Sequence, residues 1–477
     1  MNKGKIQDKK PITPPSKNFF LDAENLELDR ENQEFNNALS LVNETNQNIF
    51  LTGKAGTGKT TFLKYITEKT IKNFIILAPT GVAAINSGGT TINSFFQIDF
   101  SVYVPNDKRL STEKEKDGSR PLFKNFKYKK SKKEIIKNLD ILIIDEISMV
   151  RCDIIDVIDK ILKAYRNNAK PFGGIQVMLI GDVFQLPPIL VGEKKNILNQ
   201  FYNSGFFFES RIIQNTKLIH IELKKIYRQT DNEFIEMLNR IRIGQTTQND
   251  INKLNSRYNP NFKEDEYINL CTHNAIVEEI NLNKLDNLPE KSFFYKSKIS
   301  GSFPENNFST EKTLELKVGA QIMFIKNNTS KGFYNGKIAL ISKLEDNRVW
   351  VILKDTEVEL ELEEWNNIRY TYNKERKTVE QEIIGTFNQF PIRLAWAITV
   401  HKSQGKTFKK VYADLGDSFA PGQVYVALSR CTSFNQLFLK TKINSDVIKV
   451  DRSALAFSKQ ENTRNKHSEA DICNINT

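Results

Sequence analysis

The stretch that decides the fold reads Gly53-Lys-Ala-Gly-Thr-Gly-Lys-Thr60, and it fits the phosphate-binding loop pattern Gly-x-x-x-x-Gly-Lys-Thr at every fixed position. The apolar residues 48–52 before it predict a buried strand, and residues 60–66 after it predict the first turns of a helix. Its glycines let the backbone wrap around a triphosphate, because amide N–H groups and a helix N-terminus both favour bound negative charge. The stretch therefore predicts a nucleotide site between a strand and a helix.

Individual residues of this loop have distinct expected roles. Lys59 would reach the β and γ phosphates of the nucleotide, and the Thr60 hydroxyl would ligate Mg²⁺. The residues expected to contact the nucleotide are Gly53, Ala55, Gly56, Thr57, Gly58, Lys59, Thr60 and Thr61. The loop indicates that a nucleotide binds, but it does not indicate how the energy of that nucleotide is used.

Apolar, strand-like runs alternate with helical patterns through most of the chain. A first set comprises NIFLT, FIILAP, LDILIIDE and IQVMLIGD, and a second set comprises YINLCT, RLAWAIT, KVYADL and QLFLKT. Short β-runs separated by helices are typical of parallel sheets that carry helices on both faces. The predicted fold class is therefore α/β, with two such sheets in two domains.

Two segments interrupt this alternation. Residues 101–137 carry a lysine cluster with aromatic residues between the lysines; its members are Phe123, Lys124, Phe126, Lys127, Tyr128, Lys129, Lys130, Lys132 and Lys133. This segment is either a solvated basic loop or a nucleic-acid contact in which lysines neutralise phosphates and rings stack on bases. Residues 315–385 show alternation with little helical pattern, which predicts a small all-β module inserted into the second domain.

The overall composition favours a polyanionic partner in a reducing compartment. Lys and Arg number 69 against 57 Asp and Glu, so the formal net charge is +12 and nucleic acid is the commonest matching partner. The four cysteines form no C-x-x-C pair, which argues against structural zinc and disulfides. No apolar run approaches the ~18 residues that a membrane span needs, and the polar N-terminus lacks a secretory signal. We expect no membrane partner, and flexible ends over residues 1–27 and 458–477.

Candidate catalytic groups follow two of the predicted strands. Residues 139–146 form an apolar strand that ends in two carboxylates, of which Asp145 would hold Mg²⁺ and Glu146 would polarise an attacking water. The next strand runs into GDVFQLPP at residues 181–188, where Gln185 can sense the γ-phosphate and orient that water. The two prolines stiffen the turn that holds this glutamine.

Two arginines in the second half of the chain are candidates for completing the site. Arg228 precedes a helical stretch, and Arg430 lies near the end of the predicted helix GQVYVALSR. Each is either a surface ion-pair partner or a group that reaches across a cleft to the nucleotide of the first domain. An arginine supplied by another domain stabilises transition-state charge and makes hydrolysis depend on closure of the cleft.

Seven ordered blocks make the chain resemble superfamily 1 DNA helicases, and among them the PIF family with its RecD-like relatives. The blocks are GKAGTGKT, APTGVAAINSGG, IIDEISMV, GDVFQLPP, YRQ, AWAITVHKSQGKTF and VYVALSR, within residues 28–445. The resemblance implies two RecA-like domains with a wedge-like basic insert and an SH3-like β-barrel insert, in an ATP-dependent 5′→3′ DNA helicase. The implied boundaries are 28–210 for the first domain, 211–314 and 386–457 for the second, 101–137 for the basic insert and 315–385 for the barrel.

The same resemblance assigns roles residue by residue. Around ATP and Mg²⁺ it implies Lys59, Thr60, Asp145, Glu146, Gln185, Arg228 and Arg430, with Gln404 and Gly405 linking the nucleotide to DNA and Gln33 reading the adenine edge. Along single-stranded DNA it implies Thr80, Gly81, Ser94, Phe95, His401 and Lys402, to which the basic insert adds Lys129 and Lys130. Relatives have histidine where this chain has Asn93, which can donate a hydrogen bond to DNA but cannot stack like imidazole.

Two other functions stay open beside the helicase. An ATP-driven DNA translocase that does not separate strands would have nearly the same sequence. A GTPase-type switch would use Asn283-Lys-Leu-Asp286, but the spacing of Ile276, Ile280 and Leu285 favours a chance match on a helix. For the helicase we expect single-stranded and duplex or forked DNA as partners, with quadruplex DNA as a further candidate. We expect a monomer in the cytoplasm, associated with the nucleoid. A bacterial source is expected because high Lys and Asn content is typical of AT-rich genomes.

Overall fold

A computed structural model describes residues 32–110, 112–114, 121–123, 127–262, 267–328, 331–353 and 356–461. The flexible lead expected over residues 1–27 lies outside the described residues, as does Lys124 of the basic insert. We expected a loose tail from residue 458. This prediction is wrong for residues 458–461, because residues 452–461 form a helix. This end is held by packing: the Phe457 ring stacks on Phe208 with 4.3 Å between centroids, and Glu461 is buried.

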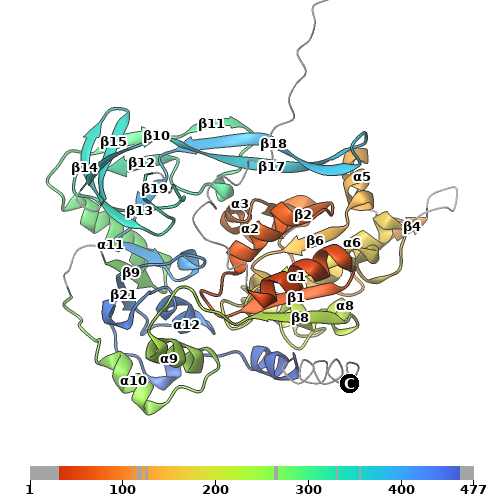
Figure 1. Cartoon of the computed structure of the whole chain (residues 1–477), viewed down its shortest axis with the longest axis horizontal. Coiled ribbons are helices and arrows are strands. Elements are labelled where there is room, and N and C mark those ends of the chain that lie inside the picture. The colour runs from red at the N-terminus through yellow and green to blue at the C-terminus, as the bar shows by residue number, and fades with distance from the viewer. Residues whose placement is uncertain are drawn as a thin grey trace, which may run out of the picture.

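The first domain is built on a six-stranded parallel sheet with the strand order β3-β2-β6-β7-β1-β8 (Figure 1). Its strands are β1 (Asn48–Gly53), β2 (Phe74–Ala78), β3 (Thr90–Thr91), β6 (Ile141–Ile144), β7 (Gln176–Ile180) and β8 (Leu218–Leu223). Ile49 packs in a cluster with α1 (Gln33–Glu44) and α2 (Lys59–Lys69), whereas Phe50 packs in the opposite cluster with α6 (Cys152–Arg166). Because both faces are covered, the central strands are almost continuously apolar. This sheet confirms the predicted α/β class.

Strand β8 extends the first domain beyond residue 210, where we expected it to end. Residues 218–223 pair in parallel with residues 48–53 of β1. The strand lies at the edge of the sheet and is only partly covered, so its sequence LIHIEL lacks the apolar run by which we identified the other strands. The chain therefore leaves the first domain only after Leu223, through a connecting segment that leads to α9 (Asn232–Arg242).

The second domain contains a smaller parallel sheet with the order β20-β9-β21-β22. Its strands are β9 (Ile268–Cys271), β20 (Ala397–Thr399), β21 (Val411–Asp414) and β22 (Leu437–Leu439), and its helices include α9 (Asn232–Arg242), α10 (Gln248–Asn255), α11 (Asn274–Asp286) and α12 (Gln423–Leu428). The run RLAWAIT was expected as one strand of this sheet, but β19 (Ile392–Leu394) leaves it to join the β module. The string Asn283-Lys-Leu-Asp286 ends α11, as its helical spacing predicted.

The β module is wider than the expected residues 315–385. Its five-stranded antiparallel sheet has the order β16-β15-β14-β13-β19, formed by β13 (Gln321–Phe324), β14 (Ile338–Glu345), β15 (Arg348–Leu353), β16 (Thr356–Leu360) and β19. Its core also takes in side chains of the pair β10 (Phe293–Lys296) and β12 (Thr313–Leu316). These additional strands have three or four residues each, too few to show a period in the sequence.

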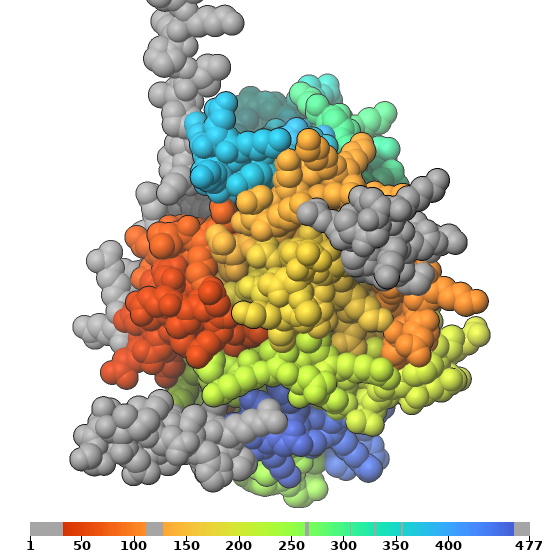
Figure 2. All heavy atoms as spheres, turned by 90° about the vertical axis from the view of Figure 1, so that its right-hand side faces the viewer, coloured from red at the N-terminus to blue at the C-terminus, as the bar shows by residue number. Residues whose placement is uncertain are grey.

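A long hairpin, β17 (Glu363–Asn373) and β18 (Thr378–Gln389), runs from the β module back to the first domain (Figure 1). Its Tyr370 is buried, and the Tyr370 hydroxyl accepts a hydrogen bond from the Ile76 amide of β2 at 3.0 Å. Near the hairpin tip, the Val379 amide donates to the Asn73 side chain at 3.1 Å. Figure 2 shows the hairpin, in light blue, resting on the orange surface that includes α5 (Lys130–Asn138). The hairpin therefore covers one edge of the first sheet.

Candidate nucleotide cleft and nucleic-acid surface

The predicted phosphate-binding loop connects β1 to α2, at the carboxyl edge of the first sheet. Gly56 has a φ of 84°, a left-handed conformation that glycine adopts without strain. The Lys59 ammonium folds back over the loop and donates to the carbonyl oxygens of Gly53 at 2.6 Å and Lys54 at 3.0 Å. Burial lowers the pKa of Lys59 to about 8, and the charges of Asp182 and Glu146 oppose that shift. Bound phosphate would favour the charged form of this lysine.

Two carboxylates stand at the end of β6, beside this loop. Glu146 has a left-handed φ of 50°, and its amide donates to the Asp145 carboxylate at 2.9 Å. Burial raises the pKa of Asp145, and the adjacent charge of Glu146 raises it further. Burial likewise raises the pKa of Glu146. Two buried carboxylates side by side are costly to ionise without a cationic partner, which suits a bound divalent cation.

Side chains of the second domain meet these groups across the cleft. The Gln404 amide donates to the Glu146 carboxylate at 2.9 Å and to the Gln185 side-chain oxygen at 3.4 Å. A second contact between the domains is made by α12, where the Tyr425 hydroxyl accepts a hydrogen bond from the Ala55 amide at 2.9 Å. Residues from the loop, the two strand ends and the second domain therefore form one continuous site.

Arg430 is buried in this cleft, with 2% of its surface exposed. Its guanidinium donates to the Val426 carbonyl at 2.9 Å, the Ser429 hydroxyl at 3.0 Å and the Lys406 carbonyl at 3.4 Å. These acceptors are all neutral, and burial lowers the pKa of Arg430 to about 10. A buried guanidinium held by neutral oxygens is poised for an anionic ligand.

We expected Arg228 in the second domain. It lies instead in the segment that leaves β8. The Tyr227 amide donates to the Gly56 carbonyl at 2.9 Å, which fixes this segment against the phosphate-binding loop. The Arg228 guanidinium donates to the Ser429 carbonyl at 3.0 Å. Burial lowers the pKa of Arg228, and the charge of Arg430 lowers it further. The two arginines thus reach one cleft, Arg228 from the connecting segment that is fixed to the loop and Arg430 from the second domain.

Sequence reasoning missed a buried ion pair under the cleft. Arg242, the last residue of α9, donates to the Asp182 carboxylate at 2.8 Å, and both side chains are almost fully buried. Burial alone would raise the pKa of Asp182, but the charges of Arg242 and Lys59 bring it below its usual value. The Gln185 amide lies 3.4 Å from the same carboxylate. Asp182 could have been found by its position at a strand end, whereas no sequence signal marks Arg242.

Gln33, which we predicted to contact the adenine of ATP, lies in α1 beside the phosphate-binding loop. Gln33 begins α1 and is exposed. Next to it, the Asn32 side chain caps α1 and donates to the Tyr227 hydroxyl at 3.2 Å. A Cβ built on Gly58 would lie 3.4 Å from the Phe35 ring and 3.6 Å from the Tyr227 ring. Two aromatic rings therefore flank the loop near Gln33.

The DNA-binding candidates of the first domain differ in accessibility. Thr80 caps α3 (Gly81–Asn86), and Ser94 is exposed on α4 (Ile92–Phe96). Phe95 is 3% exposed, because the Tyr370 ring and the Lys132 ammonium cover it; Lys132 lies 3.5 Å from the Phe95 ring centroid. In this arrangement of the hairpin the Phe95 ring is therefore not accessible to a DNA base, and its place along single-stranded DNA stays a prediction.

Asn93, which stands where relatives have histidine, donates hydrogen bonds from its side-chain amide to carbonyls of the first domain. It donates to the Ile98 carbonyl at 3.1 Å and to the Asp99 carbonyl at 3.2 Å. The residue therefore holds the turn after α4. Lys129 and Lys130 are exposed at the start of α5.

The DNA-binding candidates of the second domain lie next to the cleft. His401 and Lys402 form the short helix η6 (His401–Ser403), which directly precedes Gln404. Lys402 is exposed and His401 is half-buried. Gly405 follows Gln404 with a φ of 75°, and a Cβ built on it would have no neighbouring atom within 4 Å. Single-stranded DNA bound at η6 would thus contact residues at most three positions before Gln404, whose side chain contacts Glu146.

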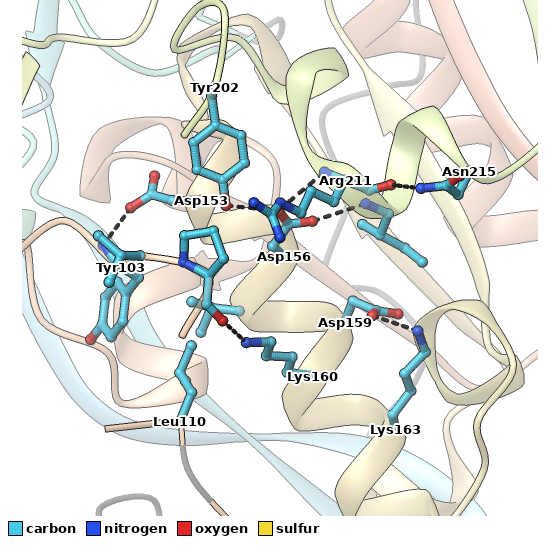
Figure 3. Close-up of a pocket in the computed structure, with 14 residues that line it drawn as sticks. Tyr103, Leu110, Asp153, Asp156, Asp159, Lys160, Lys163, Tyr202, Arg211 and Asn215 are labelled. Carbon is cyan, nitrogen blue, oxygen red and sulfur yellow. Dashed lines mark hydrogen bonds and ion pairs between the residues drawn. The ribbon is translucent and has the colours of Figure 1, made fainter. Parts of the chain in front are cut away.

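A separate pocket of about 290 Å³ lies on the first domain, between α6 and the segment that contains Tyr103 (Figure 3). Several of its charged groups have partners: Asp156 accepts from the Tyr202 hydroxyl at 2.9 Å, and Lys163 pairs with Asp159 at 2.7 Å. Among the described residues, no group of three or more His, Cys, Asp or Glu side chains is arranged to hold a metal. Within that same part of the chain, no helix is long and apolar enough to cross a membrane.

Comparisons with known proteins point to a single family. A family profile described as PIF1-like helicase matches residues 27–252, and a profile described as DNA helicase Pif1, 2B domain, matches residues 304–344. The ATP-dependent DNA helicase Pif1 of Campylobacter jejuni is 30% identical over 451 residues, which cover 87% of this chain and 95% of that protein. Vertebrate relatives are longer, and the chain spans about three fifths of their length.

Solved structures agree with this assignment. The crystal structure of Bacteroides sp Pif1 in complex with ADP-AlF4 is 39% identical, with a TM-score of 0.82, and the match covers 91% of this chain and 97% of that one. Bacteroides Pif1 bound to ssDNA is 40% identical over the same shares of the two chains, with a TM-score of 0.64.

Proposed function

This chain belongs to the PIF1-like helicase family, and from that premise and the geometry of the cleft we infer that it is an ATP-dependent DNA helicase. The observation that carries the inference is the meeting of Gln404 with Glu146 and Gln185, because it joins a predicted strand-binding segment to predicted hydrolytic groups. We further propose 5′→3′ movement on single-stranded DNA, as the resemblance implies, with forked duplex as substrate and a monomer as the active form.

The residues of the cleft have complementary roles in hydrolysis. The Lys59 ammonium, which here donates to loop carbonyls, would turn to the β and γ phosphates of ATP. Glu146 would accept a proton from the attacking water, and the Gln185 amide would orient that water. Arg228 and Arg430 would neutralise the charge that develops on the transferred phosphoryl group. The phosphate leaves with the water oxygen attached, and ADP remains on the loop.

The donor set of the cleft fits Mg²⁺, which binds oxygen ligands and retains waters. The Thr60 hydroxyl and the Asp145 carboxylate would hold it. Burial, and then the adjacent charge of Glu146, raise the pKa of Asp145, and a bound cation would favour its ionised form. When bound, Mg²⁺ would neutralise charge on the phosphates of ATP.

Movement would follow from making and breaking the contacts between the domains. The Tyr425–Ala55 and Gln404–Glu146 hydrogen bonds cross the cleft, so phosphate release that separates the arginines from the loop would also loosen these bonds. If the first domain holds DNA near Thr80 and Ser94, and the second near His401 and Lys402, then each ATP cycle advances the strand. We also propose a bacterial cytoplasmic location, associated with the nucleoid.

Strand displacement tests this proposal. The purified chain is given ATP, Mg²⁺ and a duplex with a single-stranded tail on either the 5′ or the 3′ side. We expect displacement of the duplex with the 5′ tail and little displacement of the duplex with the 3′ tail. Hydrolysis without displacement of either duplex would refute the helicase and favour the translocase. GTP is the nucleotide control, since efficient turnover of GTP alone would refute the assignment of ATP.

A further inference from the structure

Phe419 is an exposed aromatic residue near the cleft that sequence reasoning left without a role. It lies in the loop between β21 and α12, and 53% of its surface is exposed. The ring centroid of His273 lies 5.2 Å from that of Phe419, and the ring centroid of His401 lies 6.5 Å away with the planes inclined by only 22°. Three rings from three separate segments therefore line one surface of the second domain.

Cationic groups adjoin this ring cluster. Lys402 follows His401 and is exposed, and a bound phosphate would favour its charged form. Burial lowers the pKa of His401, so that its imidazole is neutral at pH 7 and available for stacking. Rings beside cations match the chemistry of a single strand, whose bases stack while its phosphates need neutralisation.

Hydrogen bonding and close packing fix the backbone of the loop that carries Phe419. The Phe419 amide donates to the Gln423 side chain at 3.0 Å, and Gln423 is fully buried. Gly422, with a φ of 74°, packs so closely on the first domain that a Cβ built on it would lie 2.5 Å from the Gln185 carbonyl oxygen. The loop that presents the ring therefore rests on the residue predicted to orient the attacking water.

We propose that Phe419, flanked by His273 and His401, is a stacking platform for a base of bound single-stranded DNA. The inference rests on the proposed function and names a contact within it. Because His401 leads into Gln404 and the Phe419 loop abuts Gln185, a base on this platform touches both connections to the nucleotide. The platform gives the enzyme a route by which strand occupancy affects hydrolysis.

The test measures the Kd for fluorescein-labelled oligothymidine by anisotropy, with the full chain. Phe419→Ala should raise the Kd about 5- to 150-fold, the range expected for loss of one stacked base. Phe419→Trp should restore tight binding, whereas Phe419→Leu, which keeps apolar bulk without a ring, should not. Phe294→Ala removes a ring of similar exposure (59%) on β10 and should leave the Kd within about twofold.

A strand in which abasic sites replace the bases separates stacking from a general effect on folding. The wild-type protein should lose affinity for this strand, while Phe419→Ala should bind intact and abasic strands almost equally. Binding of intact strand by Phe419→Ala within about twofold of the wild-type Kd would overturn the inference alone. Failure of the wild-type protein to bind single strands at all would overturn the proposed function and the platform together.

Discussion

Removal of the Arg242 guanidinium should strongly destabilise the protein. The Asp182–Arg242 pair is buried, with 0% and 9% side-chain exposure, and its shortest contact is 2.8 Å. Arg242→Met leaves the Asp182 carboxylate without its ion-pair partner in a buried site, a change that typically costs about 3–5 kcal/mol. Because Gln185 also lies against Asp182, ATP hydrolysis should fall in the same variant.

The pH dependence of this loss has a definite sign. In the wild-type protein the pKa of Asp182 is below its usual value, so its favourable contribution is present above about pH 4 and is lost as the pH falls further. Without Arg242 the effect of burial dominates and raises that pKa, so the penalty is present at pH 7 and is relieved as protonation begins. The difference in thermal midpoint between wild type and variant should therefore be largest near pH 7 and shrink towards pH 4.

A neighbouring arginine of the same helix provides the control. Arg240 pairs with Asp250 at 2.6 Å, but its side chain is 35% exposed, so Arg240→Met should cost no more than about 1 kcal/mol. Thermal midpoints of the two variants are compared between pH 4 and pH 8. Equal losses in the two variants, or a loss in Arg242→Met that grows towards acid, would refute the reasoning.

Three further predictions concern the cleft and the hairpin. Lys59→Ala should reduce ATP turnover to background in a phosphate-release assay while the Kd for single-stranded DNA rises by less than about tenfold, and retained turnover would contradict the assignment of Lys59. Tyr370→Phe removes the hydroxyl that accepts from the Ile76 amide and should cost about 1–3 kcal/mol, measured as increased hydrogen exchange in the hairpin and β2; unchanged exchange would count against this docking. Gly422→Ala places a Cβ 2.5 Å from the Gln185 carbonyl at a positive φ, so turnover should fall at least about tenfold, whereas Gly192→Ala, with open space around it, should not affect turnover.

The sequence revealed those parts of the fold that local chemistry determines. Glycine spacing identifies the phosphate-binding loop, and continuous apolar runs identify β1, β2, β6 and β7, because a strand covered on both faces needs such a run. Edge strand β8 and the short strands β10 and β12 lack that signal. Their positions depend on pairing with distant segments, which no local pattern encodes.

The same limit applies to the site. Asp145, Glu146 and Gln185 follow recognisable strands, so their meeting at one edge of the sheet could be foreseen. Arg242 could not be, because its partner is 60 residues away and an arginine on an amphipathic helix usually faces solvent. The burial of Phe95 likewise depends on Tyr370 of the hairpin, which lies 275 residues further along the chain.

Single-turnover ATP hydrolysis by Arg430→Ala tests the central claim most directly, namely that hydrolysis requires a group from each domain. With saturating single-stranded DNA, we expect the hydrolysis rate to fall about 10³-fold or more, while binding of a fluorescent ATP analogue weakens far less. Rates within about fivefold of wild type would show that Arg430 does not act on the transferred phosphate. The cleft between the domains would then not be the site where ATP hydrolysis is coupled to movement on DNA.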